Sequence, residues 1–230
     1  MKAKKKIKEY LTLGMRKLKH RKGYGVHSPF AFSIITEVIE EKTPYYAYQR
    51  MQRTLVRGAR TPISLKVATL IFRLANRLRV RRVLELPCDG GYTLMPLLLV
   101  DSRMRADSVA DAAARTHVAT HFGWLDSRIA AQVTWLDAIG DVAPEAVYDM
   151  IVVKELPPGT DPAAMAGWLL AHSHQNTAYL VKGIQPRHRL ELLWDALCDS
   201  DDVAITMDLY DYGLAIRRPR FFKQHYVVSF

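Results

Sequence analysis

The sequence predicts an α/β protein with a doubly wound, mostly parallel sheet that follows a helical segment. From Arg82 onward, short apolar runs alternate with helical patterns, which is the order of βαβ units around a parallel sheet. The run at residues 83–86 leads into a turn with two glycines, as in sheets that bind ligands at their strand ends. Before Arg82, apolar residues recur every three or four positions, which indicates helices.

The chain of 230 residues, 49% of them hydrophobic, is long enough to bury one sizeable core. We therefore expect one folded domain with an extension rather than two separate domains. The boundaries that we predict are a basic amphipathic helix at residues 1–23, a helical cap packed on the core at residues 24–80, and the sheet domain at residues 81–230.

The first third of the chain carries clear helix signals. Ser28 can cap a helix that begins with Pro29, because serine accepts a backbone hydrogen bond and proline suits the first turn. Two further helical patterns follow this one. The predicted helices span residues 29–41, 45–56 and 64–77.

The strands and helices of the sheet domain follow in alternation. Two runs near the end of the chain, residues 213–217 and 225–230, could pair as an antiparallel hairpin at one edge of the sheet. The predicted strands before them span residues 83–86, 103–106, 131–135, 150–153, 179–181 and 203–209. The predicted helices between those strands span residues 93–100, 109–121, 162–171 and 187–198.

Composition excludes several classes of protein. Cys88 and Cys198 are far apart, so neither a disulfide framework nor a zinc site is indicated. No apolar stretch approaches the length of a membrane span, and the N-terminal residues lack the pattern of a signal peptide. We expect a soluble, cytoplasmic protein.

The net charge of +10 is concentrated at one end. Residues 1–22 contain ten Lys or Arg and one acidic residue, so they carry +9, and the remainder carries +1. Their apolar positions fall on one side of a helix. Such a helix suits RNA phosphates or an anionic membrane surface, but it could equally pack its apolar stripe on the protein's own core. These alternatives stay open at the level of the sequence.

The main chemical landmark is the segment of residues 82–92, an apolar strand that contains Glu85 and leads into a turn with Gly90 and Gly91. Ligands of parallel sheets bind at the carboxyl ends of strands, where glycines let the backbone come close to them. The placement is right for a nucleoside cofactor.

At this segment and at others in the same order, the chain resembles the class I S-adenosylmethionine-dependent methyltransferases. More narrowly, it is similar to an uncharacterised bacterial branch with HSPF and KQH segments near its two ends. The resemblance implies a Rossmann-like sheet of the methyltransferase type. The matching segments are GVHSPF (25–30), IFRL (71–74), VLEL (83–86), YD (148–149), MDLY (207–210), GL (213–214) and KQHY (223–226).

The resemblance implies a cofactor site with a degenerate motif. The acid of the first strand and the glycines after it would contact the methionine part of S-adenosylmethionine, an acid after the second strand the ribose, and an acid after the third the adenine. Pro87 replaces the first glycine and removes a backbone donor. At the second strand, Arg105 could stand in place of the acid. The residues that the resemblance assigns to the cofactor are Glu85, Pro87, Asp89, Gly90, Gly91, Asp107 and Asp137.

Metal-dependent relatives carry acidic residues after the fourth and fifth strands, where they bind a divalent cation. Here Lys154 and Lys182 stand at those places. A hard cation needs clustered carboxylates, so we predict no metal site. The lysines could hold an anionic substrate or be solvated. No residue can be assigned a catalytic role from the sequence.

Two functions are consistent with these residues. The first is a metal-independent methyltransferase with an unknown acceptor. The second is a methyltransferase-like protein that has lost catalysis and acts as a scaffold, associated with RNA or an anionic membrane through residues 1–22. Fold alone does not decide between them.

Overall fold

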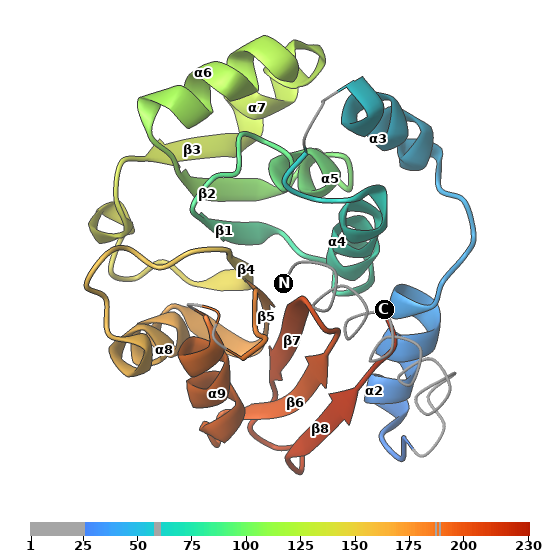
Figure 1. Cartoon of the computed structure of the whole chain (residues 1–230), viewed down its shortest axis with the longest axis vertical. Coiled ribbons are helices and arrows are strands. Elements are labelled where there is room, and N and C mark those ends of the chain that lie inside the picture. The colour runs from blue at the N-terminus through green and yellow to red at the C-terminus, as the bar shows by residue number, and fades with distance from the viewer. Residues whose placement is uncertain (1–25, 58–60, 187, 189) are drawn as a thin grey trace, which may run out of the picture.

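The computed structural model describes residues 26–57 and 61–230, apart from residues 187 and 189. An eight-stranded sheet runs through the centre of the molecule in the order β3-β2-β1-β4-β5-β7-β6-β8 (Figure 1). The strands are β1 (Arg82–Leu86), β2 (Arg105–Val109), β3 (Val133–Leu136), β4 (Tyr148–Val153), β5 (Ser173–Lys182), β6 (Val203–Asp208), β7 (Tyr212–Arg217) and β8 (Gln224–Val227).

The first five strands are parallel to one another, and β7 is inserted antiparallel between β5 and β6. The antiparallel hairpin near the C-terminus therefore exists, but it consists of β6 and β7. The expected pairing of residues 213–217 with residues 225–230 was wrong. Instead, β8 adds in parallel to the outer side of β6, because the segment after β7 crosses past β6 before it turns back.

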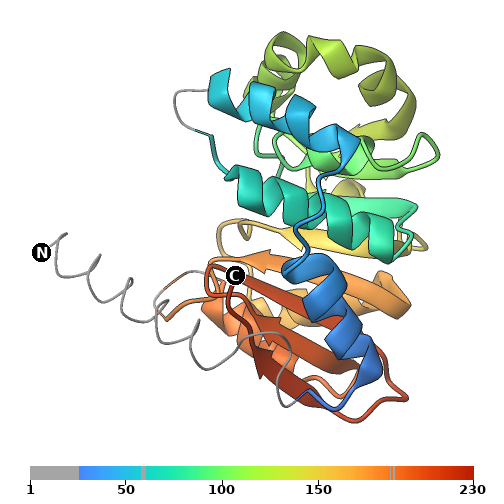
Figure 2. The same ribbon diagram turned by 90° about the vertical axis from the view of Figure 1, so that its right-hand side faces the viewer.

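Three helices, α2, α3 and α4, cover one face of the sheet (Figure 2). Ser28 accepts a backbone hydrogen bond as the N-cap of α2, as predicted. Ser64, expected as the first residue of its helix, is instead the N-cap of α4. On the same face lie α5, α6 and α7. The bounds are α2 (Pro29–Ile34) with a π-helical turn (Ile35–Ile39), α3 (Tyr46–Arg57), α4 (Leu65–Arg77), α5 (Leu94–Leu98), α6 (Ala112–His121) and α7 (Asp126–Gln132).

The other face is covered by α8 (Pro162–Ala171) and α9 (Glu191–Asp199). Each face of the sheet has its own hydrophobic layer, and the strands contribute alternate side chains to the two layers. Two apolar layers around one sheet are the doubly wound arrangement, so the predicted fold class is confirmed.

The expected elements match the structure with local differences. The second strand begins at Arg105 rather than at residue 103, and α7 was not expected. Both differences come from weak patterns, since β2 alternates charged and small residues and α7 has only seven residues.

The predicted basic helix at residues 1–23 lies outside the described residues. Among the described residues, no helix has the length and apolar character needed to cross a bilayer. The boundaries proposed for the helical cap and the sheet domain stay a prediction.

Candidate functional site

The topology brings the carboxyl ends of β1, β2, β3 and β4 to one edge of the sheet, where ligands of this fold class bind. The chain leaves β1 at Leu86 and turns through residues 87–93 before α5 begins. This turn and the ends of the neighbouring strands make up the candidate site.

Two glycines give the turn its shape. Gly90 and Gly91 have φ angles of +77° and +95°, which other residues rarely adopt. A Cβ atom on Gly90 would come within 2.9 Å of His117, and one on Gly91 within 3.0 Å of Phe122. Close packing of the turn against α6 and the residue after it therefore requires both glycines, whether or not a ligand binds.

Glu85 is fully buried and is satisfied within the protein. Its Oε2 accepts a hydrogen bond of 2.5 Å from Ser108 on β2, and its Oε1 pairs with the ammonium group of Lys154. The Lys154 side chain is only 7% exposed. We call Glu85, Asp89 and Lys154 the ionic cluster.

Asp89 completes the ionic cluster. One of its carboxylate oxygens lies 3.4 Å from the Lys154 ammonium, and the carboxylate accepts hydrogen bonds from the backbone and the hydroxyl of Thr93. Burial lowers the pKa of Lys154, but the charges of Glu85 and Asp89 outweigh burial and raise it. The two acidic neighbours therefore favour the protonated form of Lys154, while burial raises the pKa of Glu85 against the opposing charge of Lys154.

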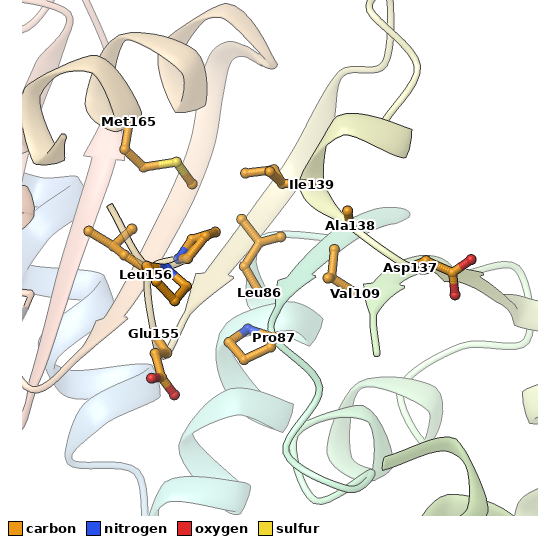
Figure 3. Close-up of a pocket in the computed structure, with 11 residues that line it drawn as sticks. Leu86, Pro87, Val109, Asp137, Ala138, Ile139, Glu155, Leu156 and Met165 are labelled. Carbon is orange, nitrogen blue, oxygen red and sulfur yellow. The ribbon is translucent and has the colours of Figure 1, made fainter. Parts of the chain in front are cut away.

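A cavity of about 350 Å³ opens beside the ionic cluster (Figure 3). Its walls are apolar, and the side chains of Leu86, Val109, Ile139 and Met165 point toward a common space. The residues that line it are Leu86, Pro87, Val109, Asp137, Ala138, Ile139, Glu155, Leu156, Pro157, Pro158 and Met165.

The sequence-predicted residues separate into two groups around this cavity. Pro87 and Asp137 line the cavity, and the Asp137 carboxylate, 85% exposed, pairs with Arg115 at its rim. Glu85 and Asp89 belong to the ionic cluster instead, and Gly90 and Gly91 pack against α6 and the residue after it.

Asp107 lies away from the cavity. It accepts a hydrogen bond from the Tyr148 hydroxyl and pairs with Arg82, both near the amino ends of their strands. Val109, two residues later, faces the cavity where a ribose-binding acid was expected. The cause is the boundary of β2, which ends later than the sequence pattern indicated. The geometry does not favour the ribose role of Asp107, and Arg105 lies farther still, at the start of β2.

A second cavity of about 230 Å³ lies at the ends of β4 and β5. Lys154 and Lys182 line it together with His188, so it is the more cationic of the two cavities. Lys182 also donates to the backbone carbonyl of Pro62. The described residues contain no cluster of three or more His, Cys, Asp or Glu side chains arranged to hold a metal ion.

The sequence did not indicate Ser108, Val109, Ile139 or Met165 as parts of the site. Ser108 was two positions beyond the expected strand, and the other three are ordinary apolar residues. Their positions at strand ends and at the start of α8 would have been the only signal.

Comparisons with known proteins identify the fold. No family model matches the chain, and no curated protein matches its sequence. Among solved structures, an O-methyltransferase from Bacillus cereus in complex with SAH has a TM-score of 0.57 at 14% identity, over 81% of this chain and 97% of its own. A methyltransferase from Geobacter sulfurreducens has a TM-score of 0.58 at 12% identity, over 78% and 92%.

A third similar structure is the O-methyltransferase TomG from Streptomyces achromogenes, in complex with SAM, with a TM-score of 0.52 at 18% identity, over 86% of this chain and 99% of its own. At such identities the similarity establishes the fold. It agrees with the resemblance that the sequence motifs carry.

Proposed function

We propose, from the class I methyltransferase fold that the chain has, that it is a methyltransferase that uses S-adenosylmethionine and needs no metal ion. The observation that carries this proposal is the apolar cavity at the carboxyl ends of β1 to β4. A cavity of about 350 Å³ is large enough for a nucleoside, and ligand sites of open α/β sheets lie at this edge.

The adenosine part of the cofactor fits this cavity. Leu86, Ile139 and Met165 offer apolar surfaces for the two faces of a purine, and Asp137 at the rim can accept a hydrogen bond from an amino or hydroxyl group. The methionine part has a poorer match, because the ionic cluster already uses the carboxylates of Glu85 and Asp89. The residues present therefore fit one end of the cofactor better than the other.

Metal independence rests on Lys154. Its ammonium group pairs with Glu85 and Asp89, so these two carboxylates are already occupied by a cation. A second cation there would meet like charge at short range, so the donor set does not suit Mg²⁺ or Ca²⁺. EDTA should leave binding and methyl transfer unchanged.

The cofactor supplies an activated methyl group, so the protein's task is to position an acceptor. We place the acceptor, a small molecule, in the second cavity, because Lys154 and Lys182 border it next to the first cavity. The ammonium of the half-buried Lys182, which donates one hydrogen bond to Pro62, would orient an acceptor that carries a negative charge.

Ligand binding can be measured by the melting temperature, since a ligand of the folded state must raise it. S-adenosylhomocysteine should raise the melting temperature of the native chain. Ile139→Trp fills the cavity and should abolish the rise, whereas Leu192→Trp, which places the same side chain at an exposed position of α9, should preserve it. No rise with millimolar ligand would contradict the proposal.

The ionic cluster favours a second function, that of a non-catalytic protein that binds an adenosine-type nucleoside. If Glu85 and Asp89 are unavailable to the methionine part, that part adds no affinity. Calorimetry separates the two functions. S-adenosylhomocysteine that binds at least tenfold more tightly than adenosine supports the methyltransferase, and equal affinities support the nucleoside-binding protein.

For residues 1–22, we keep the proposal that they associate with RNA or with an anionic membrane surface. Ten basic residues support it. Replacement of Lys2, Lys4, Lys5, Lys6 and Lys8 by glutamine should weaken binding to RNA or to anionic vesicles at low salt. Unchanged binding to both would refute the role.

A further inference from the structure

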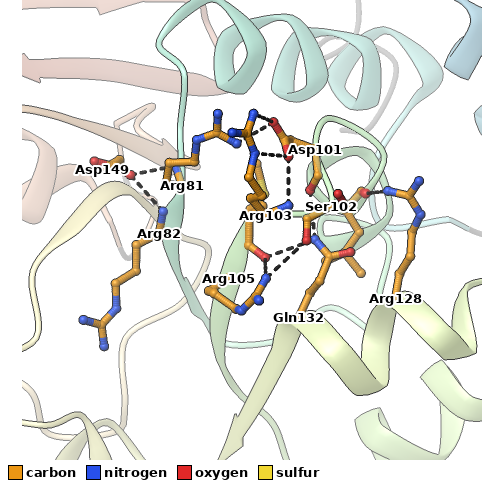
Figure 4. A network of polar contacts seen from close by, with 11 residues as sticks. Arg81, Arg82, Asp101, Ser102, Arg103, Arg105, Arg128, Gln132 and Asp149 are labelled. Atoms are coloured by element: carbon orange, nitrogen blue, oxygen red, sulfur yellow. Dashed lines mark hydrogen bonds and ion pairs between the residues drawn. The ribbon is translucent and has the colours of Figure 1, made fainter.

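The edge of the sheet opposite the cavities carries a group of arginines. They lie where α4 leads into β1 and where the chain enters β2 (Figure 4). Arg82 and Arg105 are direct partners in the register of these parallel strands, so the two groups are neighbours. We call Arg79, Arg81, Arg82, Arg103 and Arg105 the arginine edge.

The carboxylates at the arginine edge neutralise only part of this charge. Asp101 pairs with Arg81 and Arg103, and Asp107 pairs with Arg82. Asp149 accepts two backbone N–H groups and pairs with His174. Within the part of the chain that the structure describes, no carboxylate lies within ion-pair distance of Arg79 or Arg105. The Arg105 guanidinium donates through Nη1 to the backbone carbonyls of Ser102 and Met104, so its other N–H groups and the whole Arg79 guanidinium are left for a partner.

Asp101 also holds two guanidinium groups in place. It accepts hydrogen bonds from the backbone and side chain of Arg103 as well as from Arg81, and these bonds keep its pKa far below the usual range for aspartate. Arg103 nevertheless remains 75% exposed. The arrangement orients charged groups toward solvent rather than burying them.

Arg79 occupies a position that normally favours glycine. It follows the C-terminus of α4 with φ of +54°, a left-handed conformation that is strained for residues with a Cβ atom. Its side chain makes no hydrogen bond or ion pair with the described residues. This backbone conformation closes α4, since the Val80 N–H donates to the Ala75 carbonyl as at other helix ends, and the exposed Arg79 side chain is left in solvent.

The guanidinium groups of the arginine edge favour a partner that carries phosphate groups. Residues 67–153 contain nine arginines and no lysine, and guanidinium forms two parallel hydrogen bonds to a phosphate where lysine offers a point charge. Neighbouring strands are about 4.8 Å apart, so the groups form a narrow row rather than a broad face. A narrow row suits a linear polyanion better than a membrane.

An exposed aromatic residue precedes α7, the helix whose last residue reaches this edge. Trp124 is 38% exposed, with the Arg50 guanidinium 4.9 Å from its ring, just before α7 begins. The last residue of α7, Gln132, donates to the backbone carbonyls of Asp101 and Met104. Aromatic rings next to phosphate-binding cations stack with unpaired bases.

We propose that the arginine edge binds the phosphate backbone of a single-stranded nucleic acid. The surface lies opposite the cavities and does not depend on the proposed cofactor. It also differs from residues 1–22, because its cations are arginines fixed by folded strands.

Fluorescence anisotropy with a labelled 20-nucleotide oligouridylate tests the proposal on the full chain. Arg79→Gln with Arg105→Gln should weaken binding about tenfold at low salt. It should also reduce the slope of log affinity against log salt by about 1.4, which corresponds to two lost phosphate contacts. The matched control, Lys66→Gln with Arg115→Gln, removes the same charge at the opposite edge and should change the affinity less than twofold.

Arg79→Gly separates folding from binding. Glycine relieves the left-handed strain, so the melting temperature should rise while binding of the oligouridylate weakens. Three outcomes would overturn the proposal. They are no binding of the oligouridylate at low salt, equal weakening of binding by the control pair, and an affinity that the substitutions of Arg79 and Arg105 leave unchanged. Binding to phosphatidylglycerol vesicles that depends on these arginines, without binding of the oligouridylate, would overturn it in favour of a membrane.

Discussion

The two halves of the candidate site differ in burial, charge and openness. The ionic cluster after β1 is buried, charged and satisfied by the chain's own groups, whereas the cavity beside it is open, apolar and almost without polar partners. In the first half, charges of the protein neutralise one another, so a ligand gains little there. In the second half, binding must come from shape and apolar contact. The difference teaches that an acid in the expected place need not be available to a ligand.

The largest expected effect tests whether the ionic cluster is structural. Lys154→Met leaves Glu85 and Asp89 without their shared cation in a buried position, and removal of one partner of a buried pair costs about 3–5 kcal/mol. Urea unfolding should show this loss. Lys182→Met removes a lysine at the end of the neighbouring strand and should cost less than about 1 kcal/mol.

A second variant sharpens this result. Adding Glu85→Gln to Lys154→Met removes one of the two stranded charges, so part of the lost stability should return. If Lys154→Met alone were as stable as the native chain, the ionic cluster would not hold the turn together.

The next effect concerns the glycine turn that joins the two halves. Gly91→Ala places a methyl group 3.0 Å from Phe122 and Val118 in a left-handed conformation, and should cost about 3 kcal/mol. Gly140→Ala is the matched control, because no atom lies within 4 Å of its Cβ position. Equal melting temperatures of the two variants would show that the turn can adjust.

A smaller effect, on the affinity for adenosine, is expected from a charge added to the apolar half. Val109→Asp places a carboxylate at the end of β2, at the cavity wall, where it could accept hydrogen bonds from ribose hydroxyls. A hydrogen bond to a charged group contributes about 1.5–3 kcal/mol, so adenosine should bind at least tenfold more tightly. Calorimetry with adenosine and with 2′,3′-dideoxyadenosine checks this, since only the former should gain.

The smallest effect is a pH dependence at the boundary of the two halves. Burial raises the pKa of the Cys88 thiol from 9.0 to about 12. The folded protein therefore holds this proton more tightly than the unfolded chain does. The resulting stabilisation is complete below pH 9 and is lost as the pH rises toward 12. Melting temperatures between pH 8 and pH 11 should fall less steeply for Cys88→Ala than for the native chain.

The sequence predicted the fold well because apolar periodicity reports burial. The parallel strands are apolar on both sides, as β4 shows, and their pattern is hard to confuse with that of a surface element. The cap at Ser28 was equally visible. The position of β8 was not, because the pairing of a four-residue edge strand depends on the path of the preceding segment rather than on its own residues.

The site was harder to predict, and the reason differs from residue to residue. Glu85 lies on β1, next to the turn that the sequence singled out, but its partner Lys154 is 69 positions away, so only the structure shows that the two side chains meet. Asp107 was expected after the second strand, but β2 continues two residues beyond it to Val109, and two residues move a side chain by about 6.6 Å along a strand. The apolar wall of the cavity carries no signal distinct from that of the core.

The added strand β8 also has a consequence for the behaviour of the protein in solution. By pairing with β6 from Ile205 to Asp208, it covers most of the outer backbone donors and acceptors of that strand. An uncovered strand with the apolar composition of β6 would be a template for pairing between molecules. We therefore expect β8 to reduce aggregation through β6. A chain shortened before Gln224 should form dimers or larger assemblies through β6.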